Sequence, residues 1–190
     1  DNYALNFDYF NSQYVALNDS LFTDQQLTNG DYNYFTIMAW VKPDSLGNDG
    51  VNHNIFLHAT TGGSVGPNQD GLFDNKLMIR NDSIVLRLNC NSTTNTNGIY
   101  ELSYPLENYN DWTHIAYTAN GVSSGCGGTS WECGLRLYVN GLLKDSTELN
   151  NDINWKSNFE YEKVGGSGSY HGDIDDFQAW DYSLSALEIQ

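Results

Sequence analysis

The chain has 190 residues, of which 39% are hydrophobic and 14% aromatic, enough for one domain with a closed core. Its 24 acidic residues stand against 8 Lys and Arg, a formal net charge of −16, so nucleic acids and anionic membrane surfaces are disfavoured as partners. No stretch approaches the roughly 20 apolar residues of a membrane-spanning helix, so we expect no membrane insertion. Both ends look cut, and we expect the chain to be part of a larger protein.

Short apolar or alternating runs separated by Gly, Asn, Asp and Pro predict strands throughout, with little helical periodicity. Asn81-Asp82-Ser83 and Asn140-Gly141 are turn sequences, and each predicts a hairpin between the runs that flank it. A short capped helical turn is expected only near the end, at 183–187. Many short strands with Gly-rich connections favour an all-β fold, an antiparallel β-sandwich or jelly roll. The expected strands are 3–8, 14–18, 35–42, 54–59, 76–81, 84–89, 99–103, 112–119, 135–139, 142–146, 160–165 and 172–180.

The three cysteines suggest an oxidising compartment. Cys126 and Cys133 bracket a Gly-rich loop, where a short disulfide would act as a clip. Cys90 is then the odd thiol, and a small buried hydrophobe on a strand is its simplest interpretation. A zinc site is not expected, because the cysteines lack metal-ligand spacing and the four His residues are scattered.

Four segments, in order along nearly the whole chain, carry a family resemblance. They are ALNFD at 4–8 with QYV at 13–15, FTIMAWVKP at 35–43, WTHIAYT at 112–118 with LRLYVNG at 135–141, and GDIDDF at 172–177 followed by Trp180 and LS at 184–185. Together they resemble the laminin-G-like and pentraxin-related concanavalin A-like family. The resemblance implies one concanavalin A-like jelly roll over 1–190, in an extracellular or cell-surface protein.

The resemblance also implies that the first and last strands pair, which would bring Asp8 and Asn11 towards Asp175 and Asp176. Clustered carboxylates with Asn amides and backbone carbonyls are the oxygen ligands that calcium requires. We therefore expect a structural calcium ion there, although turn-forming carboxylates that face water are an equal alternative. Strand alternation sends adjacent Asp175 and Asp176 to opposite faces, so without a bulge at most one is a side-chain ligand.

Aromatic side chains that stack on sugar faces, with a few polar groups beside them, are what carbohydrate recognition needs. Trp40, Trp112 and Trp180 lie in apolar strand patterns and are expected to fill the core. The best candidates for exposed ligand-binding aromatics are Trp131, Tyr170 and Trp155, although packing against a neighbouring loop would explain each equally well.

Catalysis is not expected. The acidic strand 172–178 contains no Glu and lacks the Glu-x-Asp-x-x-Glu pattern of β-glucanases, and no nucleophile elbow, phosphate loop or dinucleotide motif is present. The sequence favours a non-catalytic, calcium-stabilised module that binds a polysaccharide or other glycan. A structural or protein-contact domain of an adhesin, without sugar affinity, is the alternative, and a glycan-cleaving enzyme ranks third.

Overall fold

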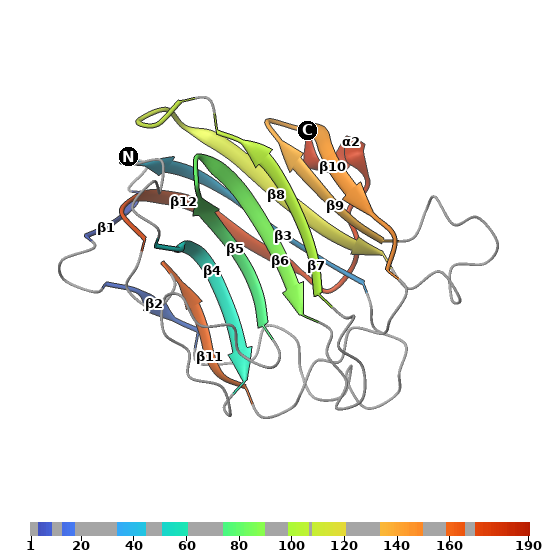
Figure 1. Cartoon of the computed structure of the whole chain (residues 1–190), viewed down its shortest axis with the longest axis horizontal. Helices are drawn as coiled ribbons and strands as arrows, with labels where there is room; N and C mark the ends of the chain where they lie inside the picture. The colour runs from blue at the N-terminus through green and yellow to red at the C-terminus, as the bar shows by residue number, and fades with distance from the viewer. Residues whose placement is uncertain are drawn as a thin grey trace.

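The computed structural model describes residues 4–8, 13–17, 34–44, 51–60, 74–89, 99–106, 108–120, 134–149, 159–165 and 170–190. Within them the chain forms two six-stranded sheets packed face to face (Figure 1). Every recorded strand pair is antiparallel, which confirms the predicted β-sandwich. The described residues contain no helix that is both long and apolar enough to cross a lipid bilayer.

The first sheet, called sheet A, joins the two ends of the chain. In spatial order its strands are β1 (Leu5–Phe7), β12 (Gly172–Trp180), β3 (Tyr34–Pro43), β8 (Thr113–Asn120), β9 (Gly134–Val139) and β10 (Leu142–Thr147). The second sheet, sheet B, has the order β2 (Val15–Ala16), β11 (Phe159–Val164), β4 (His53–Thr60), β5 (Asp74–Arg80), β6 (Ser83–Asn89) and β7 (Ile99–Pro105). All twelve strands lie within two residues of the predicted ranges.

The predicted hairpin turns are present. Asn81 and Asp82 have positive φ between β5 and β6, and Asn140 and Gly141 have φ of 51° and 74° between β9 and β10. Positive φ at both central residues matches the right-handed twist of the flanking strands, and Asn, Asp and Gly tolerate it best. Both turns could therefore be predicted from local sequence alone.

The main core lies between the two sheets and follows strand alternation. On β3, the inward side chains Phe35, Ile37, Ala39 and Val41 are all almost completely buried. Phe35 packs edge-on against Tyr117 of β8, with ring centroids 5.5 Å apart. Because successive side chains of a strand point to opposite faces, Thr36, Met38 and Trp40 must point away from this core, to the outer face of sheet A.

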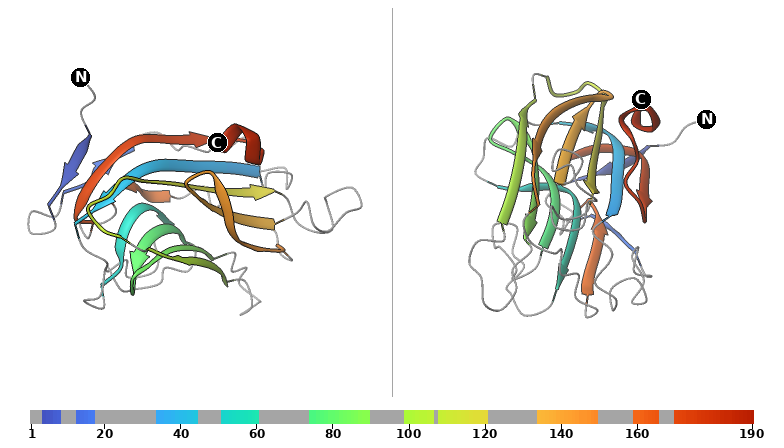
Figure 2. Two further views of the ribbon diagram at one scale, coloured as in Figure 1. Left: turned by 90° about the horizontal axis from the view of Figure 1, so that it is seen from above. Right: turned by 90° about the vertical axis from the view of Figure 1, so that its right-hand side faces the viewer.

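A second, smaller apolar cluster lies on that outer face. Helix α2 (Ala186–Ile189) crosses it beside the C-terminus, on the side of sheet A away from sheet B (Figure 2). Ser185 caps the helix, since its backbone N–H and its hydroxyl both donate to the Glu188 carboxylate, at 2.8 and 2.7 Å. We call this cluster the covered patch; its buried members are Ala116, Tyr138, Leu184 and Ile189, with Met38 and Trp180 packed against them.

A buried threonine ties the C-terminal segment to the sheet. The Thr36 hydroxyl donates to the carbonyl of Tyr182 at 2.9 Å and accepts from the N–H of Leu184 at 2.8 Å. Thr36 is fully buried, and its bond to the Leu184 N–H is buried as well, so this N–H depends on the hydroxyl for its partner. These two bonds place the chain between β12 and α2 against the outer face of sheet A.

Candidate functional site

The outer face of sheet A is divided into a covered and an open part. Met38 pairs with Ala116 across β3 and β8, and this row lies under the C-terminal helix. The next row on the same face pairs Trp40 with His114, and it extends beyond the helix. On β3, the covered side chain of Met38 and the open side chain of Trp40 are therefore only two residues apart.

The open part exposes two tryptophans. Trp40 is 40% exposed and Trp112, two residues before His114 and hence on the same face, is 41% exposed. Both line an open depression of about 770 Å³, which we call the aromatic groove. This volume is in the range of small-molecule and sugar sites. The groove is lined by Trp40, Trp112, His114, Asn140, Gly141, Leu142, Ile189 and Gln190.

Polar groups lie between and beside the two indoles. The His114 ring lies 5.2 Å from the Trp40 ring, measured between centroids, with a tilt of 47°. Burial lowers the pKa of His114, while the negative charge of Asp176 acts in the opposite direction, so the net shift favours the neutral ring, which can both donate and accept a hydrogen bond. The groove thus combines apolar ring faces with a hydrogen-bonding side chain.

The Asn140-Gly141 turn forms one wall of the groove. Asn140 Oδ1 accepts from the backbone N–H of His114 at 3.0 Å, and the Asn140 N–H donates to the His114 carbonyl at 2.8 Å. In the described part of the chain, the Asn140 Nδ2 group has no partner and remains available to a ligand. A Cβ atom on Gly141 would lie 3.2 Å from Gln190 Cγ, so the turn also packs against the C-terminus.

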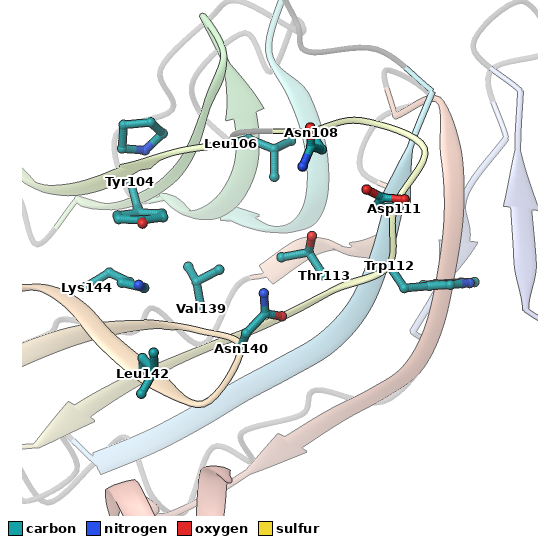
Figure 3. Close-up of a pocket in the computed structure, with 11 residues that line it drawn as sticks. Tyr104, Leu106, Asn108, Asp111, Trp112, Thr113, Val139, Asn140, Leu142 and Lys144 are labelled. Carbon is teal, nitrogen blue, oxygen red and sulfur yellow. The ribbon is translucent and has the colours of Figure 1, made fainter.

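A second depression of about 420 Å³ lies on the other side of this turn, where the edges of the two sheets approach each other. Asp145 of β10 joins these edges by accepting from the Ser103 N–H of β7 at 2.9 Å. Lys144 Nζ lies 4.7 Å from the centroid of the Tyr104 ring, a cation–π geometry. Figure 3 shows Trp112 pointing away from Tyr104 and Lys144, and Trp112 lines both this depression and the aromatic groove.

The predicted calcium ligands do not all come together. Strands β1 and β12 pair as expected, but Phe7 lies opposite Gly172, which places Asp8 beyond that end of β12. Continued by one residue, this register sets Asp8 opposite His171, four residues before Asp175, so Asp8 and Asp175 are separated by about 13 Å of strand. Asn11 lies outside the described residues, within which no group of three or more His, Cys, Asp or Glu could hold a metal ion. Calcium binding stays a prediction.

The expectation that Tyr170 is exposed is wrong. Its side chain is 1% exposed, packs edge-on against Phe7 with ring centroids 6.1 Å apart, and donates to the Asp173 carbonyl at 3.2 Å. Burial raises its pKa well above the ordinary value. Tyr170 therefore closes one end of the core and cannot stack on a ligand. Trp131, Trp155 and all three cysteines lie outside the described residues.

The assignment of Trp40 and Trp112 to the core is also wrong, whereas partly buried Trp180 packs against the covered patch. The run FTIMAWV reads as buried because it is apolar on both faces of β3. Met38 packs against the covered patch, whereas Trp40 is apolar and still 40% exposed. Because Val41 points into the core, strand alternation would have placed Trp40 on the outer face of sheet A. Alternation could not have shown that Trp40 is exposed there.

The arrangement of strands and the matched sequence agree on the family. A family model described as the concanavalin A-like lectin/glucanases superfamily, Laminin_G_3, matches residues 10–190. The chain belongs to this superfamily. The resemblance seen in the sequence and the predicted jelly roll are thereby confirmed. A search of the curated proteins finds no match.

Solved structures share the fold at low sequence identity. The CBM40 domain of the Ruminococcus gnavus IT-sialidase, bound to alpha2,3 sialyllactose, is 17% identical, with a TM-score of 0.62 over 93% of this chain and 94% of that one. Domain 4 of the arabinanase AbnA from Geobacillus stearothermophilus, in complex with arabinotriose, is 18% identical, with a TM-score of 0.53 over 84% and 66%.

A leech intramolecular trans-sialidase is likewise similar, at 17% identity and a TM-score of 0.63 over 94% of this chain, which spans 25% of that protein. The binding domain of botulinum neurotoxin DC, in complex with rat synaptotagmin II, is 15% identical, with a TM-score of 0.56 over 88% of this chain and 37% of that one. At these identities the similarity shows a common fold, so the ligand has to be inferred from the groove.

Proposed function

We propose that this chain is a non-catalytic binding module that recognises a glycan through the aromatic groove. The observation that carries the proposal is the exposure of Trp40 and Trp112 in one groove, beside the ring of His114 and the side-chain amide of Asn140. The exposed parts of the two indoles offer flat apolar surfaces on which sugar rings stack. The polar neighbours would then orient the sugar hydroxyl groups.

The comparisons support the same class of ligand. Two of the similar structures hold oligosaccharides, and one of these is a carbohydrate-binding module by name. The module would act within a larger extracellular protein, as the leech enzyme contains a region of this fold within a longer chain. Catalysis is not part of the proposal, because the sequence lacks the Glu-based pattern of the family's glucanases.

The test is glycan binding by the intact chain and by single variants in the groove. A panel of neutral, amino and acidic oligosaccharides is first screened on an array, and affinities for the positive sugars are measured by titration calorimetry. Trp40→Ala and Trp112→Ala should each weaken binding about tenfold or more, since each removes a stacking surface. Thermal melts should show that both variants remain folded at the temperature of the titration, so that a loss of binding reports the loss of the ring.

Tyr14→Ala is the matched control, because Tyr14 is a similarly exposed aromatic next to β2 of the other sheet. Its removal should leave the affinity for the sugar unchanged. Equal losses in the control and groove variants would place the binding elsewhere or make it nonspecific. If no sugar binds the intact chain, the proposal fails and the protein-contact alternative takes its place.

A further inference from the structure

On the outer face of sheet A, Trp40 and His114 form a row that the C-terminal helix leaves uncovered, which we call the open row. Two carboxylates extend this row beyond the aromatic groove. Asp175 of β12 pairs with Trp40 of β3, which pairs in turn with His114 of β8. Directly opposed residues on one face of an antiparallel pair have Cβ atoms about 5 Å apart. The Asp175 side chain is therefore a neighbour of the Trp40 indole. Its partial burial agrees with this position.

A β-bulge places the next carboxylate, Asp176, on the same side. The register of β12 against β3 shifts between Asp175 and Gln178, and Asp176 adopts a φ of 49°. Asp175 Oδ1 accepts from the Asp176 N–H at 2.8 Å, which closes the bulge. After the bulge Phe177 turns inward and stacks on Phe56 of sheet B, with centroids 5.5 Å apart.

This bulge changes the prediction made from alternation. In a regular strand Asp176 would share the inward face of Ile174, which is 1% exposed, and only Asp175 would point out. Instead Asp176 is exposed and Phe177 takes the inward position. The bulge thus keeps two adjacent negative charges outside, next to the open row of rings.

The two charges have no cationic partner among the described residues. No ion pair of Asp175 or Asp176 is present there, while Lys42 lies 3.6 Å from Asp173 of the same strand. Asp176 is close enough to act on His114, whose pKa it raises against the larger effect of burial. The groove therefore lies in an uncompensated negative field, within a chain of net charge −16.

We propose that the aromatic groove selects glycans by charge, taking chains of amino sugars with protonated amino groups ahead of their N-acetylated forms and excluding carboxylated sugars. The inference rests on the proposed function and adds Asp175 and Asp176 as specificity-determining residues. Protonated amines would gain charge-assisted hydrogen bonds to the carboxylates, whereas uronic or sialic acids would meet like charge. Indole faces favour cations as well.

A glycan fits the groove better than a cationic peptide does. The groove is open and about 770 Å³ in volume, with two indoles on one flat face, whereas capture of one ammonium group needs rings closed tightly around it. Because both rings line one open groove, a chain of sugar units, each of which carries an amino group, can contact both. The carboxylates beside Trp40 then meet the edge of the sugar chain.

The experiment compares one sugar backbone in two charge states. Glucosamine hexamer, its fully N-acetylated form and galacturonic acid hexamer are titrated into the intact chain by calorimetry at low salt and mildly acidic pH. The amino form should bind about tenfold more tightly than the acetylated form, and the uronic acid form should not bind. The ratio of the first two affinities should fall as salt rises, because ions screen exposed charges.

Asp176→Asn and the double variant Asp175→Asn/Asp176→Asn test the two carboxylates. Asn tolerates positive φ and can still accept the bulge hydrogen bond, so the backbone is preserved. The preference for the amino form should fall about threefold in the single variant and be lost in the double one. Glu101→Gln on β7 of the other sheet removes one charge as well and should leave the preference unchanged.

Any one of the following results would overturn the inference. An unchanged preference for the amino form in the double variant would show that groups other than Asp175 and Asp176 cause it. Undiminished binding of the amino form by Trp40→Ala would show diffuse attraction to an acidic protein instead of a site. Equal affinity for the two forms would leave glycan recognition standing and remove only the charge selection, whereas no binding of any sugar, or binding of a Lys-rich peptide alone, would remove both.

Discussion

The outer face of sheet A contains two regions built from the same three strands, and they serve different ends. The covered patch buries Ala116 and Tyr138 under Leu184 and Ile189, whereas one row further Trp40 and Trp112 remain about two-fifths exposed. Both regions are apolar in sequence, yet only the first is covered. Apolar side chains that stabilise the fold and those that are free for a ligand can thus alternate along one strand.

The difference arises from where the C-terminal segment is attached. Thr36 binds the backbone of Tyr182 and Leu184 at one end of β3, and the four-residue helix α2 reaches only as far as the Asn140-Gly141 turn. The aromatic groove begins there, with Ile189 and Gln190 as part of its wall. Changes in the covered patch should therefore affect stability first, and changes in the groove should affect binding first.

The largest effect on stability is expected from Leu184→Ala. Leu184 is 7% exposed within the covered patch, so the change should lower the free energy of unfolding by about 2–3 kcal/mol and the melting temperature by about 4–12 °C. Leu187→Ala is the matched control, since Leu187 belongs to the same helix but is 84% exposed. Thermal and chemical denaturation measure both, and equal losses would contradict the separation of the two regions.

A smaller loss of stability is expected from Thr36→Val, which keeps the shape of the side chain and removes its hydroxyl group. The buried Leu184 N–H would lose its partner, and the part-buried Tyr182 carbonyl would lose one as well, at a cost of about 1–3 kcal/mol. Thr36→Ser retains the hydroxyl and should recover most of this loss in urea denaturation. A fully stable Thr36→Val protein would show that helix packing alone holds the C-terminal segment.

The smallest effect concerns pH and His114 in the open row. Burial lowers its pKa in the folded state, so the unfolded chain binds the proton more readily, and folding stability should decrease as pH falls below the ordinary value of about 6.5. Above that value the contribution is fully present. In denaturation curves between about pH 5 and 7.5, His114→Gln should remove this part of the pH dependence; an identical profile would assign it to other groups.

Much of the secondary structure could be predicted, because strand alternation and turn chemistry are local. Asn140-Gly141 needs positive φ whatever surrounds it, and β3 shows its inward residues through Phe35, Ile37 and Val41. The candidate site was predicted less well. Tyr170 in a Gly-rich segment is buried by Phe7, a residue distant in the chain, and no local pattern reports that contact.

The sequence by itself determined the class of fold, the positions of the strands along the chain, the hairpin turns and the acidic character of the chain, since all of these depend on residue type and spacing. Tertiary structure alone decided which apolar face is covered, because the reach of α2 over Met38 but not Trp40 depends on the attachment at Thr36. It also decided the register that separates Asp8 from Asp175 and the bulge that exposes Asp176, because pairing between distant strands sets both.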